Sequence, residues 1–320
     1  MQLKLDNSKT YAIALEGGGA KGAYEIGVWR ALDEAGIKYN AVSGTSVGAL
    51  NGSLMAMRDL PRAENAWKDM RLSRVIDLDK EQEENLSRAF NGDIELGDAR
   101  ELIPEAWEII KNRGLDVAPL RAWVREVVDA EKVKNSDVEL FVSTVSLSDR
   151  KALEIKVNDL PADEICDMLL ASAYHPSFKL EPLGGKLYTD GGFVDTLPLH
   201  ALVTHGYKDI IAVRIPGMGR ERHFKIPDDV SITYIAPVRD LGGVLNFDAA
   251  QSRRDMAIGY LDAKRALYGL YGRQYYIERS MTERQALELL LDAAPDVAEL
   301  RGYIEHSLPR IARGLGAEDG

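Results

Sequence analysis

Short apolar runs alternate with longer stretches of helix-forming residues through the first part of the chain. Residues 11–15 form an uninterrupted apolar run, which is typical of a buried strand, and residues 23–35 follow as a predicted helix. Residues 39–43 and 49–57 repeat this order of strand and helix. Each predicted helix has one face of small residues, which are Ala23, Gly27 and Ala31 on the first helix and Gly48, Gly52 and Ala56 on the second. Strands that alternate with helices predict an α/β fold in which helices flank a central, mostly parallel sheet.

The same patterns place the later elements of this sheet. Residues 138–147 and 153–157 alternate in strand fashion across a polar link, which predicts a hairpin. Residues 161–173 and 197–205 are predicted helices, and residues 209–215 form another apolar strand. Pro and Gly follow that strand at once, and we expect the catalytic sheet to end there.

A Gly-x-Ser-x-Gly motif at residues 44–48 joins the second predicted strand to the second predicted helix. This context is the one that a nucleophile elbow requires, because the tight turn exposes the oxygen of Ser46 at a helix N-terminus. Gly44 and Gly48 remove side chains that would collide with the neighbouring strand and helix. Alone, the motif more often marks an inert serine in a glycine-rich turn, so its interpretation depends on two further segments.

The first of these segments is a glycine-rich loop between the first strand and the first helix. It consists of Glu16, Gly17, Gly18, Gly19, Ala20, Lys21 and Gly22. Successive N–H groups at a helix N-terminus hold an anion, which in an acyl hydrolase is the oxyanion of the tetrahedral intermediate. The spacing of the glycines also matches a dinucleotide-binding fingerprint. That fingerprint needs an acidic residue at the end of the next strand, and this sequence has none there.

The second segment is an Asp-Gly-Gly turn at Asp190, Gly191 and Gly192, directly after a short strand-like stretch. An Asp-Gly-Gly sequence is common in turns and carries little weight alone. Together, however, the three segments supply a nucleophile, an oxyanion site and a carboxylate. Each follows a predicted strand, and catalytic groups of open α/β sheets gather at strand ends.

These three motifs, in this order and spacing, resemble the patatin-like phospholipase family over roughly residues 9–215. Two shorter features agree with the resemblance: residues 171–176 resemble the segment that precedes the aspartate in that family, and Pro198 resembles a proline that follows it. One feature departs from the pattern, because Thr196 stands where that family often has asparagine.

The resemblance implies a three-layer α/β fold and hydrolysis of lipid carboxylic esters by a Ser46–Asp190 dyad, without histidine, metal or cofactor. The N–H groups of Gly17, Gly18 and Gly19 would form the oxyanion hole. The residues that support the motifs would be Lys21, Gly22, Gly44, Gly48, Gly191 and Gly192. An unperturbed aspartate is a weak base at neutral pH, so we expect burial beside an apolar acyl site to raise the pKa of Asp190.

Two other interpretations of the same residues stay open. A Ser-Asp-His triad, in the chain order of α/β-hydrolases, would take its histidine from those that follow Asp190. These are His200, His205, His223 and His306. His175 precedes Asp190 and could line the pocket. A lipid-binding scaffold without catalysis is the other interpretation, against which the intact Ser46 and Asp190 argue.

Residues 62–135 are predicted to be mostly helical, with amphipathic helices at residues 62–74, 98–112 and 119–131 and a strongly charged segment at residues 79–91. They form either the core of a helical layer or a cap whose apolar side receives acyl chains. The cap interpretation predicts that trimming residues 79–97 alters chain-length preference. We therefore expect a catalytic domain at residues 9–215 and a mostly helical extension at residues 216–320.

The extension contains a strand candidate at residues 230–236 and a long predicted helix at residues 247–271, but no chemical motif. We expect it to pack on the catalytic domain or to dock a partner.

The net charge limits the kinds of molecule that the protein is expected to bind. The chain has 40 Lys and Arg residues and 51 Asp and Glu residues, which gives a net charge of −11. Such a charge disfavours binding to nucleic acid and broad adhesion to anionic lipid. We expect a lipid or membrane-surface ester as substrate, captured by an apolar mouth or a local basic patch. The sequence shows no metal-ligand spacing.

The sequence also predicts where the protein is found. Cys166 is the single cysteine, which fits a reducing compartment, and the first nine residues are polar, unlike a signal peptide. No apolar run approaches the ~20 residues that a membrane helix needs, so we expect a cytoplasmic protein without a transmembrane segment.

Overall fold

The computed structural model describes residues 3–77, 114–217 and 219–270, together with residues 285 and 289. The chain divides into two compact units, Asp6–Ala263 and a second unit made of Met1–Leu5 and Lys264–Gly320. The sheet, the Ser46 motif, Asp190 and the glycine loop all belong to the unit Asp6–Ala263. The helices expected at residues 79–91 and 98–112, and the segment 79–97, lie outside the described residues.

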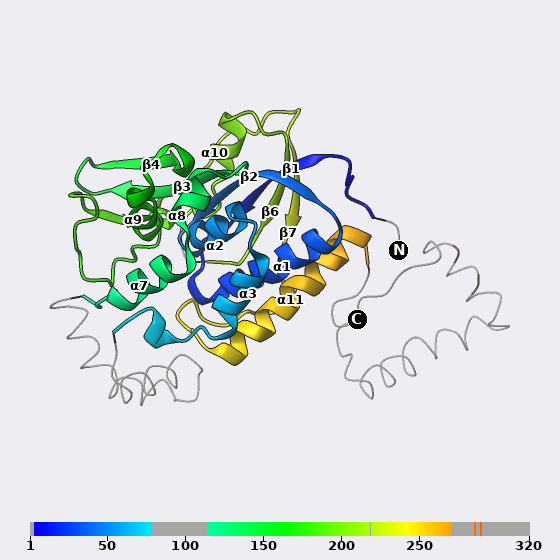
Figure 1. Ribbon diagram of the computed structural model, residues 1–320. Helices are drawn as coiled ribbons and strands as arrows, with labels where there is room; N and C mark the ends of the chain where they lie inside the picture. The colour runs from blue at the N-terminus through cyan, green and yellow to red at the C-terminus, as the bar shows by residue number, and fades with distance from the viewer. Residues whose placement is uncertain (1–2, 78–113, 218, 271–284, 286–288, 290–320) are drawn as a thin grey trace. The chain divides into compact units, whose positions relative to one another are not determined.

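A seven-stranded sheet forms the centre of this unit, with the strand order β4-β3-β2-β1-β6-β7 and β5 paired to β3 (Figure 1). The strands are β1 (Thr10–Leu15), β2 (Lys38–Thr45), β3 (Glu139–Ser146), β4 (Lys151–Lys156), β5 (Tyr188–Asp190), β6 (Asp209–Val213) and β7 (Ser231–Ile235). β4 and β5 run antiparallel to β3, and the other pairs are parallel. The predicted α/β class with a mostly parallel sheet, and the β3–β4 hairpin, are confirmed.

β7 extends the sheet beyond the end that Pro216 and Gly217 were expected to set. It pairs in parallel with β6 from Ser231 to Ile235. The expected domain limit at residue 215 therefore lies inside the unit Asp6–Ala263.

The helices of the described residues follow the predicted order. They are α1 (Ala23–Glu34), α2 (Val47–Ala56), α3 (Leu60–Lys68), α7 (Ala118–Val127), α8 (Ala130–Lys134), α9 (Ala162–Ser172), α10 (Leu199–Thr204) and α11 (Ala249–Tyr268). Two helices differ from the prediction. α3 ends at Lys68 rather than continuing to residue 74, and the helix expected at residues 119–131 is divided into α7 and α8. Asp129 causes this division, because its side chain accepts the Lys132 N–H at 3.1 Å and caps a new helix.

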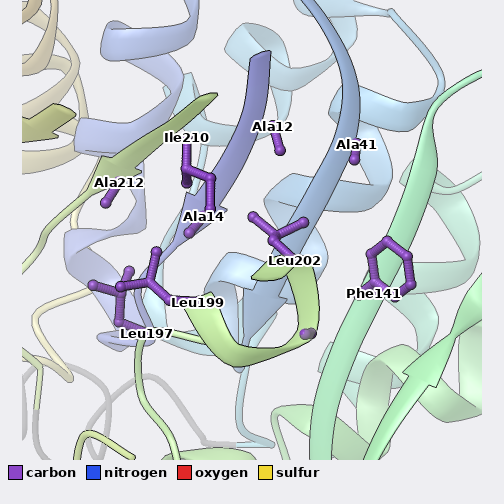
Figure 2. Close-up of a cluster of buried hydrophobic side chains, with 10 residues drawn as sticks. Ala12, Ala14, Ala41, Phe141, Leu197, Leu199, Leu202, Ile210 and Ala212 are labelled. Atoms are coloured by element: carbon purple, nitrogen blue, oxygen red, sulfur yellow. The ribbon is translucent and has the colours of Figure 1, made fainter. Parts of the chain in front are cut away.

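Helices cover both faces of the sheet, which produces three layers (Figure 1). On one face, leucines at and before α10 pack onto alanines of β1, β2 and β6, as Figure 2 shows. The small strand residues let α10 approach the sheet closely. On the other face lies α2, where a Cβ added at Gly52 would meet side-chain atoms of Leu140 and Val42 at 2.9 and 3.2 Å. The small face predicted for this helix thus faces the sheet.

The small face predicted on α1 packs against α11. A Cβ added at Gly27 would lie 1.9 Å from the Met256 carbonyl oxygen, and one added at Gly259 would lie 2.0 Å from the Tyr24 carbonyl oxygen. The backbones of the two helices are therefore in direct contact, which no residue other than glycine permits at these two positions.

Candidate active site

Ser46 lies on the tight turn between β2 and α2 with φ 55° and ψ −123°. This is a strained backbone for a residue with a side chain, and such strain persists only where neighbours enforce it. The Ser46 N–H donates to Ser172 Oγ at 3.0 Å, and Ser172 Oγ donates to the Ser143 carbonyl at 2.6 Å. A Cβ at Gly44 would lie 2.2 Å from the Gly48 carbonyl oxygen, so the turn also requires glycine there.

The register of the sheet brings Asp190 next to this turn. β2 ends with Thr45 opposite Ser143 of β3, and β5 then pairs with β3 from Thr144 onward, placing Asp190 opposite Thr144. β4 occupies the other edge of β3 over the same residues. β5 must therefore continue the position of β2, and its last residue arrives beside the residue that follows Thr45.

Asp190 is a buried carboxylate, 8% exposed. Its Oδ1 accepts the Gly192 N–H at 2.7 Å. Burial raises the pKa of Asp190 to about 6, while hydrogen bonding from the Ser46 hydroxyl and from Gly192 opposes the rise. The expected upward shift is therefore present, and its cause is the loss of water around the carboxylate.

The glycine loop lies directly beside the nucleophile, because a Cβ added at Gly17 would be 3.2 Å from the Ser46 Cβ. The Gly17 N–H donates to the Thr196 carbonyl at 2.9 Å and is thereby engaged. Among the described residues, no acceptor is bonded to the N–H groups of Gly18 and Gly19. These two groups are thus the ones that could receive an oxyanion.

Two hydrogen bonds hold the glycine loop against later segments of the chain. Lys21 Nζ donates to the Pro216 carbonyl at 2.7 Å, and the Ala20 N–H donates to the Val244 carbonyl at 2.8 Å. Gly19 has φ 59° and would place a Cβ 2.1 Å from the same Val244 oxygen, so it has to be glycine. The loop is therefore held both by the segment that follows β6 and by the segment that precedes α11.

Ser46, Asp190 and the loop glycines line one cavity of about 320 Å³. Most of its other walls are apolar. They include Leu50, Trp67, Met70, Val75, Leu120 and Trp123. A chamber of this kind accommodates an apolar chain and leaves the polar groups to fix the reacting atoms.

Of the histidines that the structure describes, His175 is the one that lines this cavity, and burial lowers its pKa. His200 Nδ1 lies 2.9 Å from a Glu154 carboxylate oxygen, and His205 Nδ1 lies 2.7 Å from the Ala201 carbonyl oxygen. His223 is exposed, and His306 is outside the described residues.

Several residues of the site carried no readable signal in the sequence. The polar supports are Ser172 and the Thr196 carbonyl, which act on the backbone of Ser46 and Gly17. Val244, Leu245 and Phe247 line the cavity from a segment without any motif. Such contacts depend on the tertiary fold, and only the Ala-Ser-…-Pro resemblance pointed toward Ser172.

Within the part of the chain that the structure describes, no group of three or more His, Cys, Asp or Glu side chains could hold a metal ion. No helix in that part is both long enough and apolar enough to span a bilayer.

The family model described as patatin-like phospholipase matches residues 13–203 of the chain. Patatin-like phospholipase domain-containing protein 6 of Mus musculus is 28% identical over 213 residues, which are 64% of this chain and 13% of that protein. Lysophospholipase nte1 of Aspergillus terreus is 48% identical over 48 residues, which are 15% of this chain and 3% of that protein. The chain thus spans about an eighth of the length of the first of these relatives.

Among solved structures, VipD from Legionella pneumophila matches with a TM-score of 0.42 and 17% identity, covering 80% of this chain and 66% of that one.

Proposed function

The chain belongs to the patatin-like phospholipase family, and from this we propose that it is a serine acyl hydrolase that cleaves carboxylic esters of lipids, of the phospholipase A or lysophospholipase type. One observation carries the proposal: a strained serine and a buried carboxylate of raised pKa lie together in an apolar cavity beside a glycine loop.

In the acylation step, Ser46 Oγ attacks the ester carbonyl carbon while the Asp190 carboxylate accepts the hydroxyl proton. The carbonyl oxygen becomes negative, and the N–H groups of Gly18 and Gly19 stabilise that charge. When the tetrahedral intermediate collapses, the bond to the alcohol breaks. Asp190 returns the proton to the leaving alcohol, and the acyl group stays on Ser46.

In the deacylation step, water takes the place of the alcohol. Asp190 accepts a proton from the water as its oxygen attacks the acyl carbon, and the same N–H groups stabilise the second oxyanion. Collapse breaks the bond to Ser46 Oγ, which regains its proton from Asp190. The products are a carboxylic acid and the free enzyme, and no oxidant or metal enters the balance.

The apolar cavity walls support a lipid acyl chain as the substrate group. Trp67, Met70, Leu120 and Trp123 all fall within residues 62–135, the region interpreted as a cap. Their arrangement around Ser46 favours the cap interpretation over a helical layer that packs only on itself.

Fatty-acid release from phosphatidylcholine vesicles and from lysophosphatidylcholine tests the substrate class. We expect release from at least one of these lipids at pH 7.5, together with hydrolysis of p-nitrophenyl butyrate as a soluble reference. Ser46→Ala serves as the blank for contaminating lipases. Cleavage of the soluble ester with no release from either lipid would contradict lipid hydrolysis and leave a small-ester esterase.

Activity should depend on pH through Asp190, which accepts a proton only when it is ionised. Since burial raises its pKa to about 6, the carboxyl is protonated and inactive below that pH. We expect kcat/KM to rise roughly tenfold per pH unit below about 6 and to level off above it. Hydrolysis of p-nitrophenyl butyrate from pH 4.5 to 8 measures this profile.

Asp195 provides the matched control for the pH profile, because it is also buried with a pKa raised to about 6 by desolvation. Asp195→Asn should keep the inflection near pH 6. A flat wild-type profile, or an inflection that disappears with Asp195→Asn, would show that Asp190 is not the titrating base.

A further inference from the structure

Behind one wall of the cavity, three buried side chains form a continuous hydrogen-bonded chain. Trp67 Nε1 donates to Asn51 Oδ1 at 2.9 Å, and Asn51 Nδ2 donates to Glu25 Oε2 at 2.8 Å and to the Gly22 carbonyl at 2.9 Å. Trp67 and Glu25 are 1% exposed and Asn51 is fully buried. None of the three belongs to the proposed dyad or oxyanion site.

The three residues connect three separate parts of the site. Trp67 is on α3 and lines the cavity, Asn51 is on α2, which begins directly after Ser46, and Glu25 is on α1, which begins directly after the glycine loop. The position of the indole is therefore tied both to the helix of the nucleophile and to the end of the glycine loop at Gly22.

The Asn51 side chain can make this connection in one orientation only. Its oxygen accepts from the indole, and its two N–H groups have two acceptors, so its amide is fully used. A flipped amide would set its NH₂ group against the indole N–H and its oxygen against the Gly22 carbonyl. The hydrogen bonds to the indole and to the Gly22 carbonyl would then be lost.

Glu25 is the buried acceptor at the end of this hydrogen-bonded chain. Complete burial raises the pKa of Glu25 well above its usual range, because a charged carboxylate loses its hydration there. Its Oε1 has no hydrogen-bond partner among the described residues. Glu25 thus provides the second acceptor for the Asn51 amide in a fully buried position.

We propose that Glu25 and Asn51 are positioning residues that hold Trp67 as a fixed wall of the acyl site, and that they thereby set its preference among acyl chains. This inference rests on the proposed function. An indole that is free to rotate would change the shape of the cavity. The preference among acyl chains depends on that shape, because an apolar chain binds through van der Waals contacts with the cavity walls. Trp123 lines the same cavity from α7 without taking part in this chain, so it offers a matched comparison.

A double-mutant cycle tests the selectivity. The readout is the ratio of kcat/KM for p-nitrophenyl decanoate to that for the butyrate ester. Asn51→Leu and Trp67→Phe should each change this ratio about three- to tenfold, because both variants lose the hydrogen bond between the indole and Asn51. The double variant should change it no further, whereas Asn51→Leu combined with Trp123→Phe should be additive. Glu25→Leu should shift the ratio, and Glu25→Gln, whose amide oxygen can accept from Asn51, should restore the wild-type value.

The indole resonance of Trp67 in ¹⁵N–¹H spectra gives a readout that needs no turnover. Its disappearance in Trp67→Phe identifies it. Asn51→Leu should move it upfield and accelerate its exchange with water, while the Trp123 resonance stays in place. An unmoved Trp67 resonance overturns the positioning role, and additive effects of Asn51→Leu and Trp67→Phe on the ester ratio overturn the role in selectivity. If no ester is cut at all, the proposed function fails while the resonance still decides the positioning.

Discussion

Replacing Ser46 by alanine is expected to lower kcat for ester hydrolysis on the order of 10⁴- to 10⁶-fold, because no other group on the turn can form the acyl-enzyme. The fold should survive, since the Ser46 N–H and not its hydroxyl makes the bond to Ser172. Turnover of p-nitrophenyl butyrate measures the loss, and the melting temperature checks the fold.

Ser53→Ala is the matched control for this substitution. Ser53 is buried on the same helix, α2, and its hydroxyl donates to the Leu50 carbonyl at 2.7 Å. Its removal should leave kcat within a few-fold of wild type. If Ser46→Ala retains wild-type turnover, the Gly-x-Ser-x-Gly motif is only a structural turn, and the glycine loop should be examined for nucleotide binding instead.

Asp190→Asn is expected to lower kcat on the order of 10³- to 10⁴-fold, the loss that follows when a buried catalytic carboxylate becomes an amide. Asparagine can still accept the Gly192 N–H through its side-chain oxygen, so the turn should keep its shape. It cannot accept the proton of Ser46, and the nucleophile therefore stays neutral. Turnover of the same ester measures this effect.

His175→Ala distinguishes a dyad from a histidine base, because His175 is the described histidine that lines the cavity. If the dyad operates, this variant should keep most of the wild-type kcat, and the lost wall contact should appear as a change in KM. A collapse of turnover in His175→Ala, with activity retained in Asp190→Asn, would assign the base to histidine and exclude the dyad.

The sequence predicts most of this site because its motifs are local. A Gly-x-Ser-x-Gly turn requires a strand before it and a helix after it, and β2 and α2 are found there. The approach of Asp190 to Ser46 depends instead on a long-range feature, the way β5 continues the position of β2 along β3. Chain order and family resemblance suggested this pairing, but no local pattern determines it.

The remaining features depend on tertiary contacts that leave no periodic signal. The Thr196 carbonyl accepts the Gly17 N–H, and for this reason Gly18 and Gly19 are the donors that we propose for the oxyanion. Val244 supports the loop from a segment that contains no chemical motif. β7 follows a Pro-Gly sequence that is typical of a domain end, but it pairs with β6 in the same sheet. The Pro-Gly sequence did not reveal this, because such a sequence also occurs in connections between two strands of one sheet.

Mapping a covalent adduct tests the central claim most directly. The protein is treated with an alkyl fluorophosphonate, which phosphonylates an activated serine, and the modified peptide is identified by mass spectrometry. The account predicts one adduct, on Ser46, formed in step with the loss of ester hydrolysis and strongly slowed in Asp190→Asn. An adduct on another residue, or complete inactivation with Ser46 unmodified, would contradict it.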